Sequence, residues 1–462
     1  MTLIDTSNFI NITMYNNISN DNISNDNITN DNITNDNISN DNIPNDNITN
    51  DNITNDNISN DNITNDNIDD EPIKFGVSKF KNIFGITCYM NSILHILQQI
   101  PIFVEYISQA KFRDIIMKKI NKKILFDKKN NIYDNDYDYD NGCSIEESYL
   151  KEYVIFELFR LFKTSLENDD SSITPTTFKT LIGKKNDIWN EYNHQDSQEF
   201  FNFLISQLEE EIGVKSEFIP GFNYVESDIN YSTDNAVKNI IATNSWIKFQ
   251  AREYSPLKNL FDGLLQNNRK CMCCNTNSIA FEPFLTLPIS IPIKNNADIE
   301  KTFDIYECIS HFTADEQLDV NNKMTCEMCG LLNQCHSTTF LWKMPKILVI
   351  HIKRFIVNAF GTPTQKITNN VTYPIKDLDL SQYFDPASPY KSSCKYDLIG
   401  INIHQAFGYG KNINAGHYTS IVKSMINNNW YLYNDSNDVI MAYTKENLQN
   451  SNAYLLFYYR HD

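Results

Sequence analysis

Basic residues are scarce in this sequence relative to acidic ones. The 462 residues include 39 Lys and Arg but 58 Asp and Glu, so the formal net charge is −19. This imbalance argues against nucleic acid as the main partner, because a phosphate backbone would be repelled, and it suits a basic protein surface or peptide tail. Long apolar runs are also missing, since no stretch approaches the roughly 18 apolar residues of a membrane span. We therefore expect neither nucleic acid nor a membrane as a partner.

A secretory leader is the next absence. The start of the chain, Met1–Thr6, lacks the basic segment and the apolar run of a signal peptide. We therefore expect the protein in the cytoplasm, the nucleus or both, where thiols stay reduced. In such a compartment the ten cysteines of the chain indicate metal ligands or catalytic groups rather than disulfides.

Sequence complexity is low at the N-terminal end. From about residue 17 to residue 69 the chain repeats the five-residue unit Asn-Asp-Asn-Ile-Thr or Asn-Asp-Asn-Ile-Ser. A period of five fits neither a helix nor a strand, and one Ile per unit buries too little apolar surface to offset the entropy of ordering the chain. We therefore predict a disordered, Asn-rich low-complexity tail over residues 1–70. Hydrophobic residues make up 41% of the chain, which is enough for a substantial core in the remainder.

The most informative stretch is residues 84–92, which have the sequence Phe-Gly-Ile-Thr-Cys-Tyr-Met-Asn-Ser. Apolar residues follow Cys88 at helical spacing, while Gly85 and Thr87 precede it as a turn and a helix cap do. The spacing predicts that Cys88 begins a buried helix, where backbone N–H groups and the helix dipole favour a thiolate. Cys88 is therefore a candidate nucleophile. The alternative is a buried structural cysteine, which is what most cysteines are.

The stretch around Cys88 also resembles a known family. The pattern Gly85-x-Thr87-Cys88-Tyr-Met-Asn-Ser is similar to the cysteine box of the ubiquitin-specific proteases, papain-like cysteine proteases that remove ubiquitin from proteins. The resemblance covers about residues 76–462, which it implies are the catalytic domain. It implies an α+β, papain-like fold with a helical thumb carrying Cys88, a β-rich palm, and fingers with a zinc site at their tips that hold the globular part of ubiquitin. Ubiquitin and ubiquitinated proteins are then the expected partners.

A second box lies in the thumb region. Asp196 is followed three residues later by Glu199 and then by apolar residues at helical spacing, which predicts a capped helix. Residues 194–200, His-Gln-Asp-Ser-Gln-Glu-Phe, are similar to the family's Gln-Gln-Asp-x-x-Glu-Phe, from which His194 departs. The resemblance implies that Asp196 and Glu199 bind the arginine-bearing tail of ubiquitin by charge-assisted pairing.

Four cysteines form two pairs with metal-binding spacing. Cys271 and Cys274 make one C-x-x-C, and Cys326 and Cys329 make another about fifty residues later. Four thiolates in two such pairs form a closed tetrahedral Zn2+ site, and the glycine after the second pair eases the turn around the metal. Because no coordination position stays open, we expect the zinc to be structural. Redox pairs are the alternative, but nothing here resembles a thioredoxin-type unit. Cys273 is the ambiguous thiol, and C-x-x-C geometry favours its neighbours.

The candidate base is His417, which lies in a Gly-His-Tyr sequence at the start of an apolar segment. An Asn-rich turn separates this segment from Trp-Tyr-Leu-Tyr followed by Asn434 and Asp435. If the hairpin closes within residues 425–428, His417 lies opposite Asn434 or a near neighbour, and this partner orients the imidazole toward the sulfur. His404 is the runner-up base, and in the family its position is a non-catalytic neighbour.

The chain order Cys, His, Asn is that of papain-like proteases. The resemblance places Asn434 at the third catalytic position, and Asp435 sharing or assuming that role is the alternative. A continuous apolar run over residues 345–355 matches the family's Pro-x-x-Leu-x-x-x-x-Lys-Arg-Phe pattern and predicts a central strand covered on both faces. The implied reaction is acyl transfer, in which His417 deprotonates Cys88 and the thiolate attacks the carbonyl of ubiquitin's C-terminal glycine.

One departure from the family's pattern concerns the oxyanion hole. The family usually places an oxyanion-stabilising Asn five residues before the cysteine, but that position is Ile83 here and Asn82 lies one residue earlier. A small backbone shift lets Asn82 serve; otherwise the loss of one donor costs on the order of a hundredfold or more in rate. The departure favours a slow enzyme or one that depends on an activating protein partner. Two alternatives stay open: a ubiquitin-binding protein with little or no catalysis, and an isopeptidase for another ubiquitin-like modifier.

Overall fold

The chain divides into two units, Met1–Ile73 and Lys74–Asp462, and every residue described in this computed structural model belongs to the second. The described residues are 78–129, 149–167, 172–191, 193–213, 234–252, 254–294, 298, 300–318, 322–358, 363–392, 394–406, 416–424, 427–435, 441–443 and 448–461. The predicted tail over residues 1–70 lies outside them. Among the described helices, none is both long enough and apolar enough to cross a membrane.

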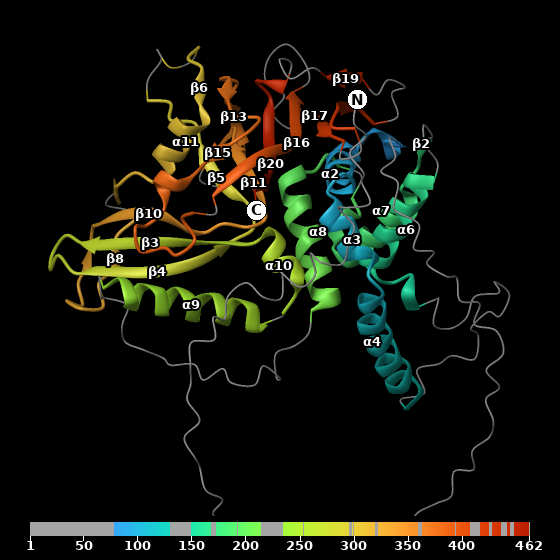
Figure 1. Cartoon of the computed structure of the whole chain (residues 1–462), viewed down its shortest axis with the longest axis horizontal. Coiled ribbons are helices and arrows are strands. Elements are labelled where there is room, and N and C mark those ends of the chain that lie inside the picture. The colour runs from blue at the N-terminus through green and yellow to red at the C-terminus, as the bar shows by residue number, and fades with distance from the viewer. Residues whose placement is uncertain are drawn as a thin grey trace, which may run out of the picture. The chain divides into compact units, whose positions relative to one another are not determined.

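The largest sheet corresponds to the predicted palm (Figure 1). Its strands span Leu287–Ser290 (β5), Ile347–Lys353 (β11), Leu378–Asp379 (β15), Lys395–Ala406 (β16), Gly416–Lys423 (β17), Trp430–Tyr433 (β18), Met441–Tyr443 (β19) and Ala453–Arg460 (β20). The strand order is β19-β18-β17-β16-β20-β11-β5, and β15 pairs with β16. β11 and β20 are buried over most of their length, which confirms the central strand predicted within residues 345–355.

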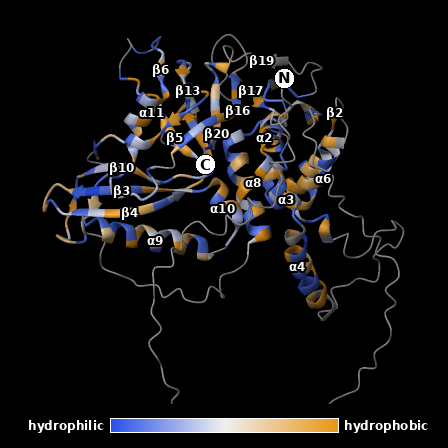
Figure 2. Cartoon of the chain, viewed as in Figure 1, coloured by the Kyte–Doolittle hydropathy of each residue, from blue (hydrophilic) through white to orange (hydrophobic). Residues whose placement is uncertain are grey.

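Helices gather on one side of this sheet and form the thumb (Figure 1). They span Cys88–Gln98 (α2), Pro101–Ser108 (α3), Ala110–Lys129 (α4), Val154–Glu167 (α6), Thr176–Lys185 (α7), Ser197–Ile212 (α8) and Pro256–Phe261 (α10), with 3-10 turns at Ile83–Gly85 (η3) and Asp187–Trp189 (η5). A short parallel pair, Lys79–Phe80 (β1) with Ser172–Ile173 (β2), closes the thumb. Apolar residues concentrate where α2, α3 and α8 meet, as Figure 2 shows.

The fingers are a separate sheet that projects from the palm (Figure 1). Their strands span Gly263–Cys271 (β3), Asn277–Phe284 (β4), Glu316–Gln317 (β7) and Cys335–Lys343 (β10), in the order β4-β3-β10-β7. A two-stranded hairpin, Met324–Thr325 (β8) with Leu332–Asn333 (β9), lies near their tip. The helix Asn235–Arg252 (α9) packs on one face of this sheet through a cluster that includes Ile241, Phe281 and Trp342.

Smaller elements complete the palm. They are Phe303–Asp304 (β6), Ile305–Phe312 (α11), Phe355–Val357 (β12), Pro363–Lys366 (β13), Val371–Thr372 (β14) and Ser381–Tyr383 (η7). α11 begins with a complete capping box, in which the Asp304 side chain accepts from the Glu307 backbone N–H and the Glu307 side chain accepts from that of Asp304. The apolar side of α11, which includes Ile305 and Ile309, joins the palm core.

α2 is the helix that joins thumb and palm, and all eleven of its residues are buried. It packs against β16 and β17 on one side and against α8 and α3 on the other. A glycine permits the close approach, because a Cβ added to Gly400 on β16 would lie 2.8 Å from the Ile96 side chain. The absence of a side chain at this position therefore sets how deeply α2 sits on the sheet.

This contact generates a stability prediction. Gly400→Ala is expected to destabilise the fold by about 1–3 kcal/mol, because the added methyl overpacks a buried contact with a β-branched side chain. Urea unfolding followed by tryptophan fluorescence measures the change. In an Ile96→Ala background the same substitution should cost little, since the opposing side chain is gone. An equal cost in both backgrounds would contradict this account of the contact.

Candidate active site

Cys88 is the first residue of α2, as predicted. The turn before it contains Gly85 with φ of 75°, a left-handed conformation that suits glycine. Thr87 occupies the N-cap position, but its side chain makes no capping hydrogen bond, so that part of the prediction is wrong. The Thr87 hydroxyl instead accepts from the Ile83 backbone N–H at 2.8 Å and lies 3.2 Å from Asn82 Oδ1. The Thr87 side chain thus stabilises the turn before α2 and does not cap the helix.

The Cys88 thiol is buried, with only 1% of the residue exposed. Burial raises the pKa of Cys88 to about 11, whereas backbone hydrogen bonds from Tyr418 and Tyr89 lower it and the charge of Asp435 raises it further. The helix N-terminus was predicted to favour a thiolate, but desolvation outweighs it here, because a buried charge loses its hydration. The resting sulfur is therefore protonated at neutral pH and needs a base.

His417 lies at the start of β17, and Asn434 follows the end of β18. The two strands are antiparallel, with Ser420 opposite Tyr433. The imidazole Nε2 of His417 is 2.6 Å from the Asn434 Oδ1, so the predicted proximity is found. Because an amide oxygen only accepts, Nε2 carries the hydrogen of the neutral imidazole, and the lone pair of Nδ1 is available to take a proton.

Asp435 is a second polar neighbour of His417. Its Oδ2 lies 3.6 Å from His417 Nε2, and its backbone has φ of 48°, an uncommon value for a non-glycine residue. Asn82 Nδ2 donates to Asp435 Oδ2 at 2.8 Å, and Asn91 Nδ2 donates to Asp435 Oδ1 at 2.9 Å. The structure therefore brings together all five residues predicted to form the catalytic centre: Cys88, His417, Asn434, Asp435 and Asn82.

Asn91 is a site residue that the sequence analysis missed. It lies three residues after Cys88 within the wholly buried α2. A signal was present, because a fully buried helix has no solvent to satisfy a carboxamide and Asn91 must therefore bond to protein. What the sequence does not contain is the identity of that acceptor, which lies 344 residues further along the chain.

The second box forms the N-terminus of α8. Asp196 is its N-cap, with Oδ1 accepting from the backbone N–H groups of Gln198 and Glu199. Its other oxygen accepts from the hydroxyls of Tyr418 at 3.2 Å and Tyr454 at 2.6 Å. Glu199 is exposed, and partial desolvation of its carboxylate by the surrounding protein, together with the charge of Asp196, raises its pKa. Both oxygens of Asp196 thus have protein partners, while Glu199 presents its side chain to solvent.

His404, the runner-up base, lies on β16 beside the site. Burial lowers its pKa to about 3, so the ring stays neutral, and it packs against Tyr418 and Phe355. Gly416 leaves room for this ring, because a Cβ at that position would overlap the His404 imidazole. His404 therefore fills space between strands, as a neighbour of the candidate base rather than its substitute.

The four paired cysteines converge at the tip of the fingers. Cys271 Sγ lies 4.0 Å from Cys329 Sγ, and Cys274 Sγ lies 3.6 Å from Cys326 Sγ. All four ligand atoms lie within 4.8 Å of one another. A tetrahedral zinc ion with Zn–S bonds of about 2.3 Å holds its sulfurs about 3.8 Å apart. The arrangement therefore fits a metal ion, and Cys273, exposed on the turn, is not among the four.

Two similar turns present these thiols. In each, the fifth residue donates a backbone hydrogen bond to the carbonyl of the first cysteine, from Asn275 to Cys271 at 2.9 Å and from Gly330 to Cys326 at 2.7 Å. Each fifth residue has a positive φ, 57° at Asn275 and 69° at Gly330. The predicted role of the glycine is confirmed, and an asparagine, which also tolerates the left-handed region, takes the equivalent place in the other turn.

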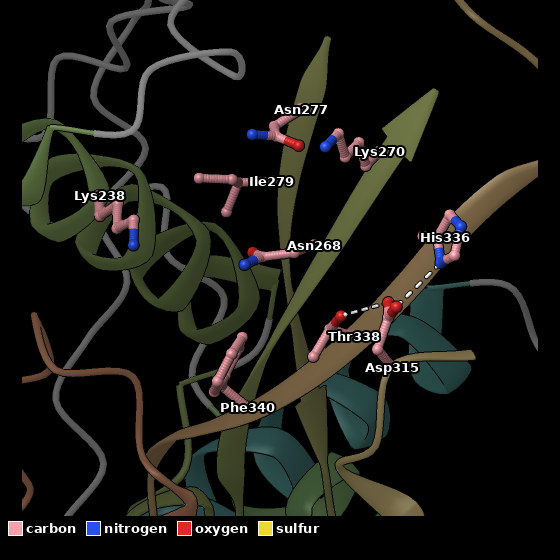
Figure 3. Close-up of a pocket in the computed structure, with 9 residues that line it drawn as sticks. All are labelled: Lys238, Asn268, Lys270, Asn277, Ile279, Asp315, His336, Thr338 and Phe340. Carbon is pink, nitrogen blue, oxygen red and sulfur yellow. Dashed lines mark hydrogen bonds and ion pairs between the residues drawn. The ribbon is translucent and has the colours of Figure 1, made fainter. Parts of the chain in front are cut away.

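A hollow of about 350 Å³ lies elsewhere, on the side of the fingers that carries α9. Figure 3 shows its lining, which is mostly polar and contains the bonded group His336, Asp315 and Thr338. None of the residues predicted to act in catalysis lines it. Its position and lining separate it from the cysteine and histidine site.

Comparison with known proteins agrees with this geometry. The family model described as ubiquitin carboxyl-terminal hydrolase matches residues 79–458. Ubiquitin carboxyl-terminal hydrolase 2 of Gallus gallus is 33% identical over 303 residues, which cover 65% of this chain and 78% of that protein. Its Homo sapiens namesake is 29% identical over 383 residues, covering 83% of this chain and 55% of that protein. The chain thus spans about half the length of the human relative.

A solved structure supports the fold. A chain in the SAGA Ubp8/Sgf11/Sus1/Sgf73 DUB module bound to ubiquitin aldehyde aligns with a TM-score of 0.54 and 21% identity, covering 84% of this chain and 70% of that one. At that identity the match speaks for the arrangement of helices and strands alone. The matched family model extends from β1 to β20 and so includes the cysteine, histidine and paired-cysteine elements. The chain therefore belongs to the ubiquitin carboxyl-terminal hydrolase family of cysteine-type ubiquitin hydrolases.

Proposed function

We propose that this chain hydrolyses the peptide or isopeptide bond at the C-terminal glycine of ubiquitin, with Cys88 as nucleophile, His417 as base and Asn434 as the residue that orients the base. The observation that carries the proposal is the 2.6 Å contact between His417 Nε2 and Asn434 Oδ1. It turns Nδ1 away from Asn434, and the backbone of the adjacent Tyr418 hydrogen-bonds the thiol of Cys88. The base on β17 and the nucleophile at the start of α2 therefore both lie where this strand contacts this helix.

The chemistry follows from these positions. His417 Nδ1 accepts the thiol proton, and the thiolate attacks the carbonyl carbon of the ubiquitin glycine. The tetrahedral oxyanion collapses to a thioester as the amine leaves with a proton from His417. Water, deprotonated by His417, then hydrolyses the thioester and releases Cys88. The Asn434 oxygen accepts the Nε2 hydrogen throughout, so the ring keeps its orientation while its charge changes.

The burial of Cys88 bears on the rate. A nucleophile with 1% of its surface exposed cannot meet a substrate carbonyl until neighbouring groups move. We infer that binding of the ubiquitin tail uncovers the sulfur, which couples reactivity to substrate recognition. The same feature, with Ile83 at the usual oxyanion position, supports a slow enzyme or one that needs an activating protein. It also favours the second candidate function, a ubiquitin-binding protein with little catalysis.

The decisive assay is hydrolysis of a ubiquitin C-terminal fluorogenic amide by the full chain and its Cys88→Ala variant. We expect turnover that falls at least about a thousandfold in the variant, because the covalent route is lost. Ubiquitin binding without turnover in the unmodified chain would instead favour the binding protein or a missing activator. Neither turnover nor binding would point to a different ubiquitin-like modifier.

The proposed contact for the ubiquitin tail involves Asp196 and Glu199 unequally. Glu199 is exposed and offers a carboxylate to an incoming arginine by charge-assisted hydrogen bonds. Asp196 supplies negative charge behind it while its oxygens hold the α8 backbone, Tyr418 and Tyr454. We propose that Glu199 makes the direct contact and that Asp196 acts mainly through the framework.

This division predicts two different mutant phenotypes. Glu199→Gln is expected to raise KM about tenfold with stability unchanged, since a charge-assisted bond contributes roughly 1.5–3 kcal/mol. Asp196→Ala is expected to lower the free energy of unfolding by about 2 kcal/mol or more, because it removes a helix cap and leaves two buried hydroxyls without an acceptor. Steady-state kinetics and urea unfolding measure the two effects. Equal stability losses in both variants would refute the division.

We propose that Cys271, Cys274, Cys326 and Cys329 hold one structural Zn2+. When bound, the ion cross-links the tips of β3 and the β8–β9 hairpin and leaves no open position for catalysis. The spacing of the four sulfurs supports this assignment. A second group, Asp377, Asp397 and His461, has ligand atoms as close together, but it is an exposed surface cluster whose members pair with one another.

Metal analysis tests the zinc site with a matched control. Cys326→Ser is expected to lose most of one bound zinc per chain and to destabilise the protein by at least about 2 kcal/mol, because metal binding contributes directly to folding. Cys273→Ser, which changes a neighbouring thiol outside the cluster, should keep both zinc and stability. Mass spectrometric metal analysis and urea unfolding give the two readouts. Zinc loss in the control alone would reassign the ligand.

The remaining proposals concern partners and compartment. We propose ubiquitin and ubiquitinated proteins as the partners, with an activating protein as a further one, and neither nucleic acid nor membrane. We propose the cytoplasm, the nucleus or both as the compartment. The nine cysteines of the described residues are free, which supports a reducing environment, because thiols in oxidising compartments tend to form disulfides.

A further inference from the structure

We propose that Asn82 and Asn91 are positioning residues that hold the carboxylate of Asp435 beside His417, and that this task, rather than oxyanion stabilisation, is the part Asn82 plays in the reaction. The inference rests on the proposed function of Cys88 and His417 and assigns a task to residues around them. It concerns a junction of three chain segments: the turn before α2, α2 itself, and the segment that follows β18.

Both the oxygen and the nitrogen of the Asn82 side-chain amide form hydrogen bonds. Its Oδ1 accepts from the Thr87 backbone N–H at 2.7 Å, and the Thr87 hydroxyl lies 3.2 Å from the same oxygen. Its Nδ2 donates to Asp435 Oδ2 at 2.8 Å. Asn82 therefore ties the residue immediately before the nucleophile to the carboxylate beside the base. One of the two Nδ2 hydrogens is thus committed to Asp435, and this bond sets the direction of the amide.

Asn91 approaches the same carboxylate from α2. Its Nδ2 donates to Asp435 Oδ1 at 2.9 Å and to the Phe80 carbonyl at 3.2 Å. Its Oδ1 is buried and has no hydrogen-bond partner among the described residues. A buried oxygen without a hydrogen bond is unfavourable. The orientation of the Asn91 amide must therefore be held by the bonds that its nitrogen donates. The two acceptors of Asn91 thus fix its direction.

The side-chain amides of Asn82 and Asn91 donate to different oxygens of the Asp435 carboxylate. This leaves Asp435 Oδ2 3.6 Å from His417 Nε2, where its negative charge stabilises the imidazolium that forms when Cys88 loses its proton. Burial raises the pKa of Asp435, and the hydrogen bonds from Asn91 and Asn82 act in the opposite direction, toward the ionised form. Among the described residues, two further titratable groups interact with this pair: Cys88 from α2 with Asp435, and His404 from β16 with His417.

The arrangement accounts for the departure at position 83. With Ile83 where the family usually has an amide, Asn82 is displaced by one residue and meets Asp435 instead. An amide, that of Asn82, is thus still present near Cys88, but it holds the Asp435 carboxylate beside His417. Loss of such positioning lowers the rate without removing any group that touches substrate.

A double-mutant cycle tests the inference. The variants are Asn82→Ala, Asp435→Asn and the double substitution, with kcat/KM for the fluorogenic ubiquitin amide measured across pH in the full chain. Each single change is expected to lower kcat/KM by roughly tenfold to a hundredfold. The double variant should be no more than about twofold below the poorer single, because both changes disable the same contact.

The pH profile distinguishes positioning from direct catalysis. The base must be neutral to accept the thiol proton, and the carboxylate 3.6 Å from Nε2 favours its protonated form, so loss of the held carboxylate should move the acid limb of kcat/KM to lower pH in both single variants. An oxyanion donor would behave differently: Asn82→Ala would lower kcat by about a hundredfold or more at every pH, with effects that multiply with those of Asp435→Asn. That outcome would overturn the proposal.

Two further variants keep the test decisive. Asn91→Ala addresses the other oxygen of Asp435 and should reproduce the same shift and the same lack of additivity, which covers the case in which Asn82→Ala does not fold. Ile83→Asn adds an amide at the family's position, and its effect should multiply with that of Asp435→Asn, because it acts apart from the carboxylate. Asn91→Ala without any shift would count against the proposal.

A readout independent of turnover separates this inference from the proposed function. The imidazole resonances of His417, assigned with a His417→Gln variant, report the surroundings of the base by NMR in each protein. If the unmodified chain shows no turnover, the proposed function fails, yet these resonances should still shift in Asn82→Ala in the direction seen in Asp435→Asn, because both variants remove the held carboxylate from the imidazole. Resonances that stay the same in both variants would reject the inference even in an active enzyme.

Discussion

The burial of α2 between the palm sheet and the thumb is the contact on which the rest of the site depends. A wholly buried helix takes polar side chains out of water, and several of those on α2 bond to protein instead. Ser92 accepts from Asn402 on β16 at 2.8 Å, and Asn402 accepts in turn from Ser197 of α8 at 2.8 Å. Gln98 donates to Ser165 at 2.7 Å. These bonds fix the rotation and depth of α2, and so the place of Cys88.

The same burial has a chemical consequence. A cysteine at the N-terminus of an exposed helix is a reactive thiolate, but here desolvation raises the pKa of Cys88 to about 11. The proposed nucleophile is thus protonated at rest, and in the proposed mechanism its activation depends on His417 and on movement of the groups that cover it. An unreactive resting thiol limits side reactions with electrophiles. The position of Cys88 is set by the hydrogen bonds of α2, whereas the protonation of its thiol is set mainly by desolvation.

Much of this architecture could be predicted from the sequence. The start of α2, the N-cap at Asp196, the central strand β11 and the two paired-cysteine turns all follow from local spacing and residue type. The contact between His417 and Asn434 followed from hairpin geometry, because the intervening turn limits the register. These features depend on residues close together in the chain, where periodicity and turn chemistry decide the outcome.

The sequence could not predict which hydrogen-bond partner each polar group has. Asp196 looked like an open carboxylate, yet Tyr418 and Tyr454, more than two hundred residues away, occupy its second oxygen. Asn82 had the right chemistry for an oxyanion hole, but its nitrogen meets Asp435, 353 residues further along the chain. Such partners are chosen by tertiary packing, which local patterns do not encode. Because the Asp435 carboxylate orients the Asn82 amide, tertiary packing rather than residue type directs this side chain toward the base.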